Sequence, residues 1–183
     1  DGETITLQIY DFLHDDKPDG TKAPLTIGMK NLMAATQNMN ASATNVGGWE
    51  SSLMRTTTMP VVFDKLPSDL QAIICEVNKK TSAGNLSTDI IISADKIFLF
   101  SQIEVDGLMN AVYKDEGKKY PLFTSYASRI KKLANGIGSA NTWWLRSPNK
   151  EFVRSFKMVT STGNTNDYKD ARDKYGVAFG FCI

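Results

Sequence analysis

Two segments near the end of the chain restrict the folds that it can adopt. Residues 143–148 read WWLRSP, and residues 176–183 read GVAFGFCI. Adjacent tryptophans on a strand point to opposite faces, so we expect one to lie in the core and the other to pack on a second layer or line a groove. Arg146 shares a face with Trp144 and is suited to stack on an aromatic ring or to clamp a carboxylate. We interpret both segments as a structural frame.

Both ends of the chain show the alternation of a strand. Residues 4–10 place Ile5, Leu7 and Ile9 on one face, which we expect to point into the core. Residues 177–183 alternate large apolar side chains with small ones in the same way. Strands at the two ends of a compact domain can pair and tie down both termini, so we expect these two to be neighbours.

Local patterns predict further elements. Residues 66–79 carry an apolar stripe with Pro67 in the first turn, which indicates a helix. Residues 97–100 are wholly apolar and predict a buried strand, and residues 101–104 (SQIE) fit a capping box that starts a short helix. Weaker patterns predict short helices over 29–36 and 129–134 and a strand over 152–159.

The length and composition favour one α+β domain over residues 1–183. The chain has 42% hydrophobic and 22% charged residues, which is ordinary for a globular protein, and shows neither an internal repeat nor a linker. It begins at Asp1, without a methionine or a signal peptide. We therefore expect a domain excised from a longer or processed protein.

Charge and hydropathy indicate which partners to exclude. The formal net charge is +1, so no overall field attracts nucleic acid or an anionic membrane. No apolar run approaches the length of a membrane span. We expect no nucleic-acid partner and no membrane insertion by this chain.

Several common catalytic arrangements are missing. His14 is the only histidine, so a histidine-rich zinc site cannot form and any Ser-His-Asp or Cys-His arrangement would have to use it. No glycine-rich phosphate loop of the usual forms is present. A carboxylate pair for glycoside hydrolysis remains open, because its members need not be close in sequence. We expect no enzymatic activity, no catalytic residue, no cofactor and no metal.

Two smaller features leave alternatives open. Cys75 and Cys182 are either two free, buried thiols or one long-range disulfide. An acidic segment near the N-terminus is either a solvated surface turn or a calcium site. Its carboxylates are Asp11, Asp15, Asp16 and Asp19.

A polar tract over residues 149–175 lies between the two frame segments. It is rich in Tyr, Asn and Arg, which binding surfaces use for rigid aromatic area, adaptable hydrogen bonds and planar charge. The alternative is an ordinary solvated hairpin. We expect Tyr168 and Arg172 to anchor a ligand-binding surface. Its members are Lys150, Arg154, Asn166, Asp167, Tyr168, Asp170 and Arg172.

The chain resembles a family of uncharacterised domains found in gut bacteria of the Firmicutes type and their prophages. The family has no agreed biochemical activity, so the resemblance names a pattern without supplying a function. The ordered series that carries it comprises residues 9–16 (IYDFLHDD), 39–40, 44–55 (TNVGGWESSLMR), 66–70, 95–101, 143–148 and 176–183.

The ending of the chain is also similar to the C-terminal part of C-type-lectin-like domains, a group that includes formylglycine-generating-enzyme-like proteins and variable receptor-binding proteins of phages. This resemblance implies paired N- and C-terminal strands, and ligand contact through the polar segment before the last strand. Formylglycine-generating enzymes depend on a nearby pair of cysteines, whereas Cys75 and Cys182 are far apart in the sequence. The Glu-Pro-Asn and Gln-Pro-Asp motifs of calcium-dependent sugar binding are absent.

Together these observations predict a single C-type-lectin-like α+β domain with a small antiparallel sheet and a few short helices. We expect a non-enzymatic extracellular binding or display module that recognises a protein or a glycan. It would belong to the cell surface, a secreted protein or a phage virion. The alternatives are an enzyme of the formylglycine-generating type or an unassigned hydrolase, and a structural spacer.

Overall fold

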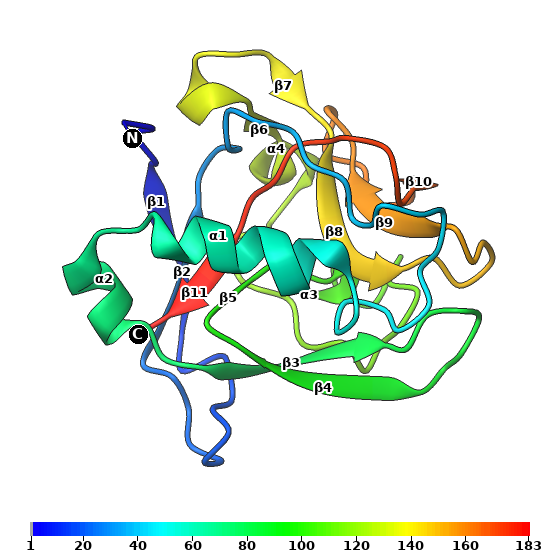
Figure 1. Ribbon diagram of the computed structural model, residues 1–183, viewed down its shortest axis with the longest axis horizontal. Helices are drawn as coiled ribbons and strands as arrows, with labels where there is room; N and C mark the ends of the chain where they lie inside the picture. The colour runs from blue at the N-terminus through cyan, green and yellow to red at the C-terminus, as the bar shows by residue number, and fades with distance from the viewer. Residues whose placement is uncertain (1) are drawn as a thin grey trace.

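The computed structural model describes residues 2–183 and divides the strands among four antiparallel sheets (Figure 1). The largest sheet has the order β1-β2-β11-β5. Its strands are β1 (Leu7–Phe12), β2 (Leu25–Met29), β11 (Gly180–Cys182) and β5 (Ile97–Phe98).

The first and last strands share this sheet but do not pair, so the prediction that they are neighbours is wrong. β2 lies between them, with Ile27 opposite Ile9 on β1 and opposite Phe181 on β11. β2 has no fully exposed residue, whereas β1 exposes three of its side chains, so β2 suits an inner position and β1 an edge.

The expected inward face of β1 is also wrong. Leu7 and Ile9 are exposed, and Tyr10 is the residue buried in the core. The Tyr10 ring stacks on Phe100 at a centroid distance of 4.6 Å, and its hydroxyl donates to the Met29 carbonyl at 3.0 Å. Because strand side chains alternate, burying the larger aromatic ring turns its aliphatic neighbours toward solvent.

The second sheet joins β10 (Tyr168–Asp170), β9 (Ser155–Val159) and β8 (Trp143–Pro148). Both tryptophans are fully buried, so of the two alternatives predicted for the second one, packing within the fold is the one that the structure supports, and neither ring lines a groove. The Trp143 indole donates to the Arg129 carbonyl at 3.1 Å, and the Trp144 indole donates to the Gln37 carbonyl at 2.8 Å. The strand predicted over 152–159 begins only at Ser155, because residues 153–154 turn before it.

Two hairpins complete the strands: β3 (Val77–Ser82) with β4 (Ile90–Asp95), and β6 (Lys131–Lys132) with β7 (Ala140–Asn141). The long helix predicted over 66–79 is wrong. Helix α2 covers only Ser68–Ile73, and the chain continues into β3. Val77, Lys79 and Thr81 are buried on alternate positions, and this two-residue period overrides the helical one.

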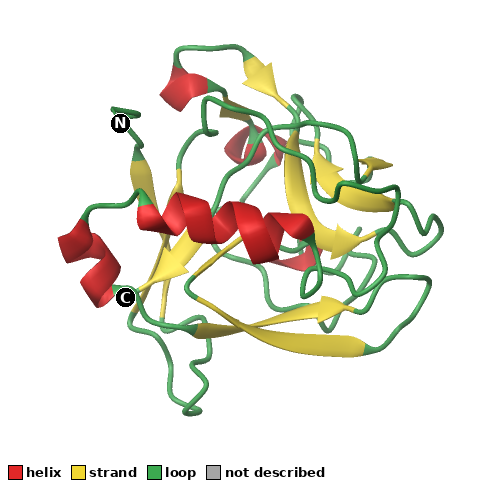
Figure 2. Ribbon diagram, viewed as in Figure 1, coloured by secondary structure: helices red, strands yellow, loops and turns green. Residues whose placement is uncertain are grey.

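Each helical segment is short (Figure 2). The capping box predicted at Ser101 is confirmed: the Ser101 amide donates to the Glu104 carboxylate at 2.9 Å, and α3 (Gln102–Asp106) follows. The helix predicted over 29–36 does not form, because Met33 bonds to the Val177 carbonyl at 3.0 Å. The remaining helices are η1 (Met54–Thr58), α1 (Met59–Asp64), α4 (Tyr126–Arg129) and η2 (Ala134–Gly136).

Two of these helical segments depart from the predictions. The continuous turns of η1 and α1, which cross the front of Figure 1, carried no predicted helix. The helical turn expected over 129–134 is displaced: α4 ends at Arg129, and residues 131–132 form β6. Within residues 2–183, no helix is long and apolar enough to cross a membrane.

The last segment of the chain is buried on both faces. Val177, Phe179 and Phe181 pack into the core as expected, and the small side chains between them are buried as well. A Cβ on Gly180 would lie 2.7 Å from the Phe100 ring, so glycine allows this strand to approach the aromatic core. The fold is therefore α+β, with small antiparallel sheets around this segment.

Candidate functional site

The structure brings the seven predicted binding residues together at one end of the molecule. This end is formed by β9 and β10 and lies opposite β1, α2 and both termini (Figure 1). Lys150 follows β8, Arg154 precedes β9, and the others lie on β10 or beside it. We call the set the display surface: Lys150, Arg154, Asn166, Asp167, Tyr168, Asp170 and Arg172.

Three of these residues line an open cavity of about 350 Å³, the display cavity. Lys150, Asn166 and Tyr168 form one part of it, and residues 109–112 form another. Met109 is 89% exposed. This second wall was not predicted, because residues 109–112 carry no periodic or motif signal in the sequence.

A buried side chain connects two segments at the display cavity. The Gln102 side-chain oxygen accepts a hydrogen bond from the Val112 amide at 2.9 Å, and its nitrogen donates to the Thr165 carbonyl at 2.9 Å. Gln102 belongs to α3 and is fully buried. The segments on both sides of the cavity are thus attached to the same helix, which favours a preformed shape.

The aromatic anchor of the surface is held by its neighbours. Tyr168 stacks on Phe152 with a centroid distance of 4.9 Å. The Lys157 amine lies 5.8 Å from the Tyr168 ring centroid and donates to the Asn166 carbonyl at 2.8 Å. Burial lowers the pKa of Lys157. These contacts restrict Tyr168 before any ligand arrives.

Asp170 orients the two arginines of the display surface. Its carboxylate accepts from Arg154 Nη2 at 2.8 Å and from Arg172 Nε at 2.9 Å. The hydrogen bonds from Arg172 lower the pKa of Asp170 to about 2. Both arginine side chains remain more than half exposed, at 58% and 52%. They are available to a carboxylate or another hydrogen-bond acceptor of a partner.

Asp167 differs from the other members of the surface. Its carboxylate accepts a hydrogen bond from the Tyr168 amide at 2.8 Å, and its carbonyl accepts from the Met158 amide at 3.2 Å. Asp167 therefore shapes the turn into β10, and the structure gives it a local role within the loop.

Exposed apolar side chains adjoin the display surface. Buried Asn45 joins three loops: its amide group donates to the Phe152 carbonyl at 3.1 Å, and its side-chain oxygen accepts from the Asn85 amide at 2.8 Å. Four exposed apolar side chains lie on these loops. They are Val46, Leu86, Phe152 and Val153.

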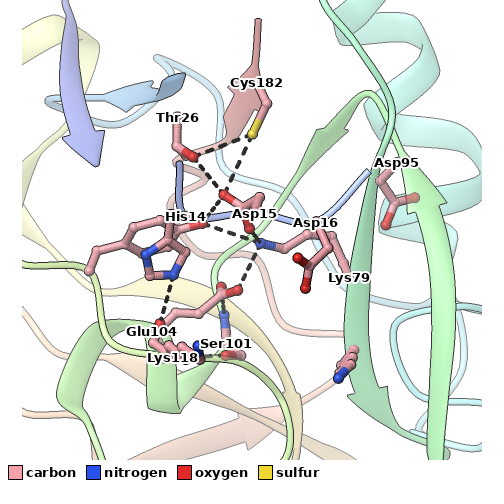
Figure 3. A network of polar contacts seen from close by, with 12 residues as sticks. His14, Asp15, Asp16, Thr26, Lys79, Asp95, Ser101, Glu104, Lys118 and Cys182 are labelled. Carbon is pink, nitrogen blue, oxygen red and sulfur yellow. Dashed lines mark hydrogen bonds and ion pairs between the residues drawn. The ribbon is translucent and has the colours of Figure 1, made fainter. Parts of the chain in front are cut away.

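A second polar arrangement lies inside the molecule (Figure 3). The Lys79 amine is 2.7 Å from Asp15 Oδ1 and 2.7 Å from Glu104 Oε1. Arg146 Nη2 donates to Glu104 Oε1 at 2.9 Å, which confirms that Arg146 clamps a carboxylate. We call Asp15, Lys79, Glu104 and Arg146 the charge network. All four are buried, and they join the β1–β2 loop, β3, α3 and β8.

The network holds its carboxylates in the ionised state. Burial raises the pKa of Asp15, but the charge and hydrogen bond of Lys79 outweigh it and keep the pKa below its usual value. Tyr120 and Thr26 also donate to Asp15, at 2.8 and 2.6 Å. Arg146 and Lys79 likewise overcome the burial of Glu104 and lower its pKa. Because protein donors already bind both carboxylates, their main effect is to hold four elements together.

Glu116 lies next to this network without an ion-pair partner in residues 2–183. Its carboxylate accepts hydrogen bonds from the Ser147 hydroxyl and, at 2.8 Å, from the Ser82 amide. Burial raises the pKa of Glu116 to about 7. Asp15, Glu104 and Glu116 contribute to a cavity of about 450 Å³, the charged cavity.

His14 also lines the charged cavity, and both of its ring nitrogens contact protein oxygens. Its Nδ1 lies 2.8 Å from the Asp11 carboxylate, and its Nε2 lies 3.2 Å from the Lys118 carbonyl. The ring stacks on Tyr120 at a centroid distance of 4.1 Å. These contacts fix the orientation of the imidazole ring at the wall of the charged cavity.

The acidic segment does not gather into one site. Asp16 pairs with Lys22 at 2.6 Å, and Asp19 accepts from the Thr21 hydroxyl at 2.6 Å. Asp11 and Asp15 bind His14 and Lys79, as described above. Within residues 2–183, no three His, Cys, Asp or Glu side chains are grouped as metal ligands. These carboxylates are therefore engaged in separate local contacts.

Both cysteines are free thiols. They are far apart in the sequence, but they lie opposite each other in an isolated antiparallel bridge and are therefore close in space. Cys182 is buried. Neither thiol lines the display cavity or the charged cavity.

Comparison with known proteins gives a family without a function. No curated protein and no solved structure matches the chain. One family, described as a domain of unknown function (DUF6273), matches residues 26–183. The matched region contains the whole display surface and all of the charge network except Asp15. The chain therefore belongs to the DUF6273 family of domains of unknown function.

Proposed function

We propose that this chain is a non-enzymatic extracellular module that binds a protein or a glycan through the display surface. One observation carries the proposal: Lys150, Asn166 and Tyr168 of the display surface line an open cavity together with the exposed side chain of Met109. Such a combination of Tyr and apolar side chains is typical of recognition surfaces.

A protein partner has more support than a glycan. Phe152 covers one face of Tyr168, and the Lys157 amine lies 5.8 Å from the ring centroid, so the ring offers a sugar less stacking area than an isolated tyrosine would. The exposed side chains of Met109, Phe152 and Val153 add apolar area of the kind that protein partners cover. The two arginines held by Asp170 provide planar donors for acidic groups of such a partner.

We further propose a C-type-lectin-like fold and a place on a cell surface, a secreted protein or a phage virion. The sequence resemblance is the main support, with gut Firmicutes or their prophages as the source. The separation between a buried frame and an exposed polar segment before the last strand is compatible with it. In this arrangement the loops at β9 and β10 vary with the partner, while β8 and β11 carry the frame.

The enzymatic alternative rests on two features. Glu116 has a pKa of about 7 in the charged cavity, and the two cysteines are close in space. A formylglycine-generating type of chemistry requires an accessible thiol beside a second reactive group, but Cys182 is buried and lines neither cavity. Rapid labelling of Cys182 in the folded chain would favour this alternative, and an unreactive thiol would count against it. The spacer alternative requires no binding at all.

The proposal can be tested with an array of extracellular proteins and glycans. The folded chain is applied together with Tyr168→Ala and Arg172→Ala, and with Phe12→Ala as an exposed aromatic control on β1. We expect binding to a small set of proteins that both surface variants reduce and the control retains. Binding to glycans alone would replace the protein partner with a sugar. No binding by a chain shown to be folded would contradict the proposal and favour the spacer.

A further inference from the structure

The two cysteines of the chain are partners in the fold. Cys75 follows α2, and Cys182 is the last residue of β11. They face each other in an isolated antiparallel bridge, and the Cys75 amide donates to the Cys182 carbonyl at 2.9 Å. Two cysteines placed at random in a chain of this length would rarely lie directly opposite each other.

Their side chains lie on the same side of the sheet. Residues directly opposite in an antiparallel pair project to the same face. Cys182 is also opposite Thr26 on β2, and the Thr26 hydroxyl lies 3.4 Å from the Cys182 sulfur on the side that holds Asp15. Burial raises the pKa of both thiols, and the Cys182 thiol lies 3.5 Å from the Asp15 carboxylate.

The separation suits a disulfide. Opposite residues in an antiparallel pair have Cα atoms about 4.5–5.5 Å apart, within the range of about 4.4–6.8 Å that disulfides span. A rotation of the two side chains therefore suffices, without a change in the path of the backbone. Cys75 is half-buried and Cys182 is buried, so an oxidant meets Cys75 first.

We propose that Cys75 and Cys182 form an intramolecular disulfide when the chain meets a low-molecular-weight disulfide. The Cys75 thiolate attacks one sulfur of this oxidant, forms a mixed disulfide and releases one small thiol. The Cys182 sulfur then loses its proton, attacks the Cys75 sulfur and releases the second small thiol. Two electrons and two protons pass from the cysteine pair to the oxidant, which becomes two thiols.

The bond would connect the last strand, β11, to the segment between α2 and β3. It would hold β11 in the large sheet and close a loop that contains the whole display surface. Cross-linking so long a loop restricts the unfolded chain strongly. The oxidised form would therefore keep its frame under conditions that unfold the reduced form.

The test compares the folded chain in dithiothreitol and in oxidised glutathione at mildly alkaline pH. We expect the oxidised sample to lose two hydrogen atoms per chain by intact mass and to yield one peptide pair that joins Cys75 to Cys182. Its thermal midpoint should rise by on the order of 10 °C and return on reduction. A chain that keeps both thiols, or that stops at a glutathione adduct on Cys75, would overturn the proposal.

Cys75→Ser is the matched control because Cys75 is the less buried partner. This variant should show neither the mass change nor the rise in thermal midpoint. Cys182→Ser should accumulate the glutathione adduct on Cys75 without the internal bond. If Cys182→Ser does not fold, the peptide map of the unaltered chain decides alone. A rise in midpoint that persists in Cys75→Ser would contradict the proposed cross-link.

Discussion

Tyr168 stacks on Phe152 with their ring centroids 4.9 Å apart and their planes inclined by 21°. The two residues come from segments on either side of β9, so the contact joins the turn after β8 to β10. It gives the display surface a rigid aromatic pair before a partner binds.

The aromatic pair should show energetic coupling. Phe152→Ala, Tyr168→Ala and the double variant form a cycle in which offset-stacked rings contribute about 0.5–1.5 kcal/mol beyond the area that they bury. Urea unfolding of the four proteins measures the coupling free energy. If the decreases in unfolding free energy of the two single variants sum to that of the double variant within error, the stack does not stabilise the surface.

Breaking the charge network should be far more costly than breaking a surface ion pair. Glu104→Gln leaves the buried Lys79 and Arg146 without their shared carboxylate and should lower the free energy of unfolding by about 3–5 kcal/mol. Arg154→Gln breaks the exposed pair with Asp170 and should cost less than about 1 kcal/mol. Similar decreases in unfolding free energy for the two variants would show that the buried charge network contributes no more to stability than an exposed ion pair.

Glu116 should make the protein less stable as the pH rises toward neutrality. Its pKa is about 7 in the folded chain and 4.5 as the reference for the unfolded chain. The stability that it contributes is present below pH 4.5 and lost as the pH rises through 7, by on the order of 3 kcal/mol. Glu116→Gln should flatten this change in urea unfolding, whereas exposed Glu151→Gln should not. An unaltered profile in Glu116→Gln would assign the titration to another group.

Lys131 should act in the opposite direction at higher pH. Its amine is fully buried and donates to the Tyr10 hydroxyl at 3.0 Å, and burial lowers its pKa from 10.5 to about 7. The stability that Lys131 contributes is present above pH 10.5 and is lost as the pH falls through 7, by on the order of 5 kcal/mol. Lys131→Met should remove this rise between pH 7 and 10.5. Its exposed neighbour serves as the control, since Lys132→Met should retain the rise.

Local signals in the sequence predicted local structure. The capping box at Ser101 formed because its two partners are three residues apart and need no distant contact. The seven display residues gathered because they come from one tract that forms adjacent turns and strands. Of the two roles predicted for Arg146, the structure shows the carboxylate clamp, although the sequence did not show which carboxylate.

The features that were not predicted depend on contacts between segments that are distant in the sequence. Residues 66–79 have a helical stripe, but burial of Lys79 between Asp15 and Glu104 requires a strand there. The members of the charge network are scattered over the chain, so no spacing rule could have joined them. The wall at residues 109–112 is attached to α3 through the hydrogen bond from the Val112 amide to the Gln102 side chain, for which the sequence carries no pattern.

The most direct test of the account is the dissociation constant for a partner selected on the array, measured by calorimetry for three proteins. Relative to the unaltered chain, we predict that Tyr168→Ala weakens binding by on the order of 30-fold, as loss of a central aromatic anchor does. Phe12→Ala, on a strand of the other large sheet, should bind like the unaltered chain. Equal dissociation constants for all three proteins would contradict the claim that the display surface is the binding site.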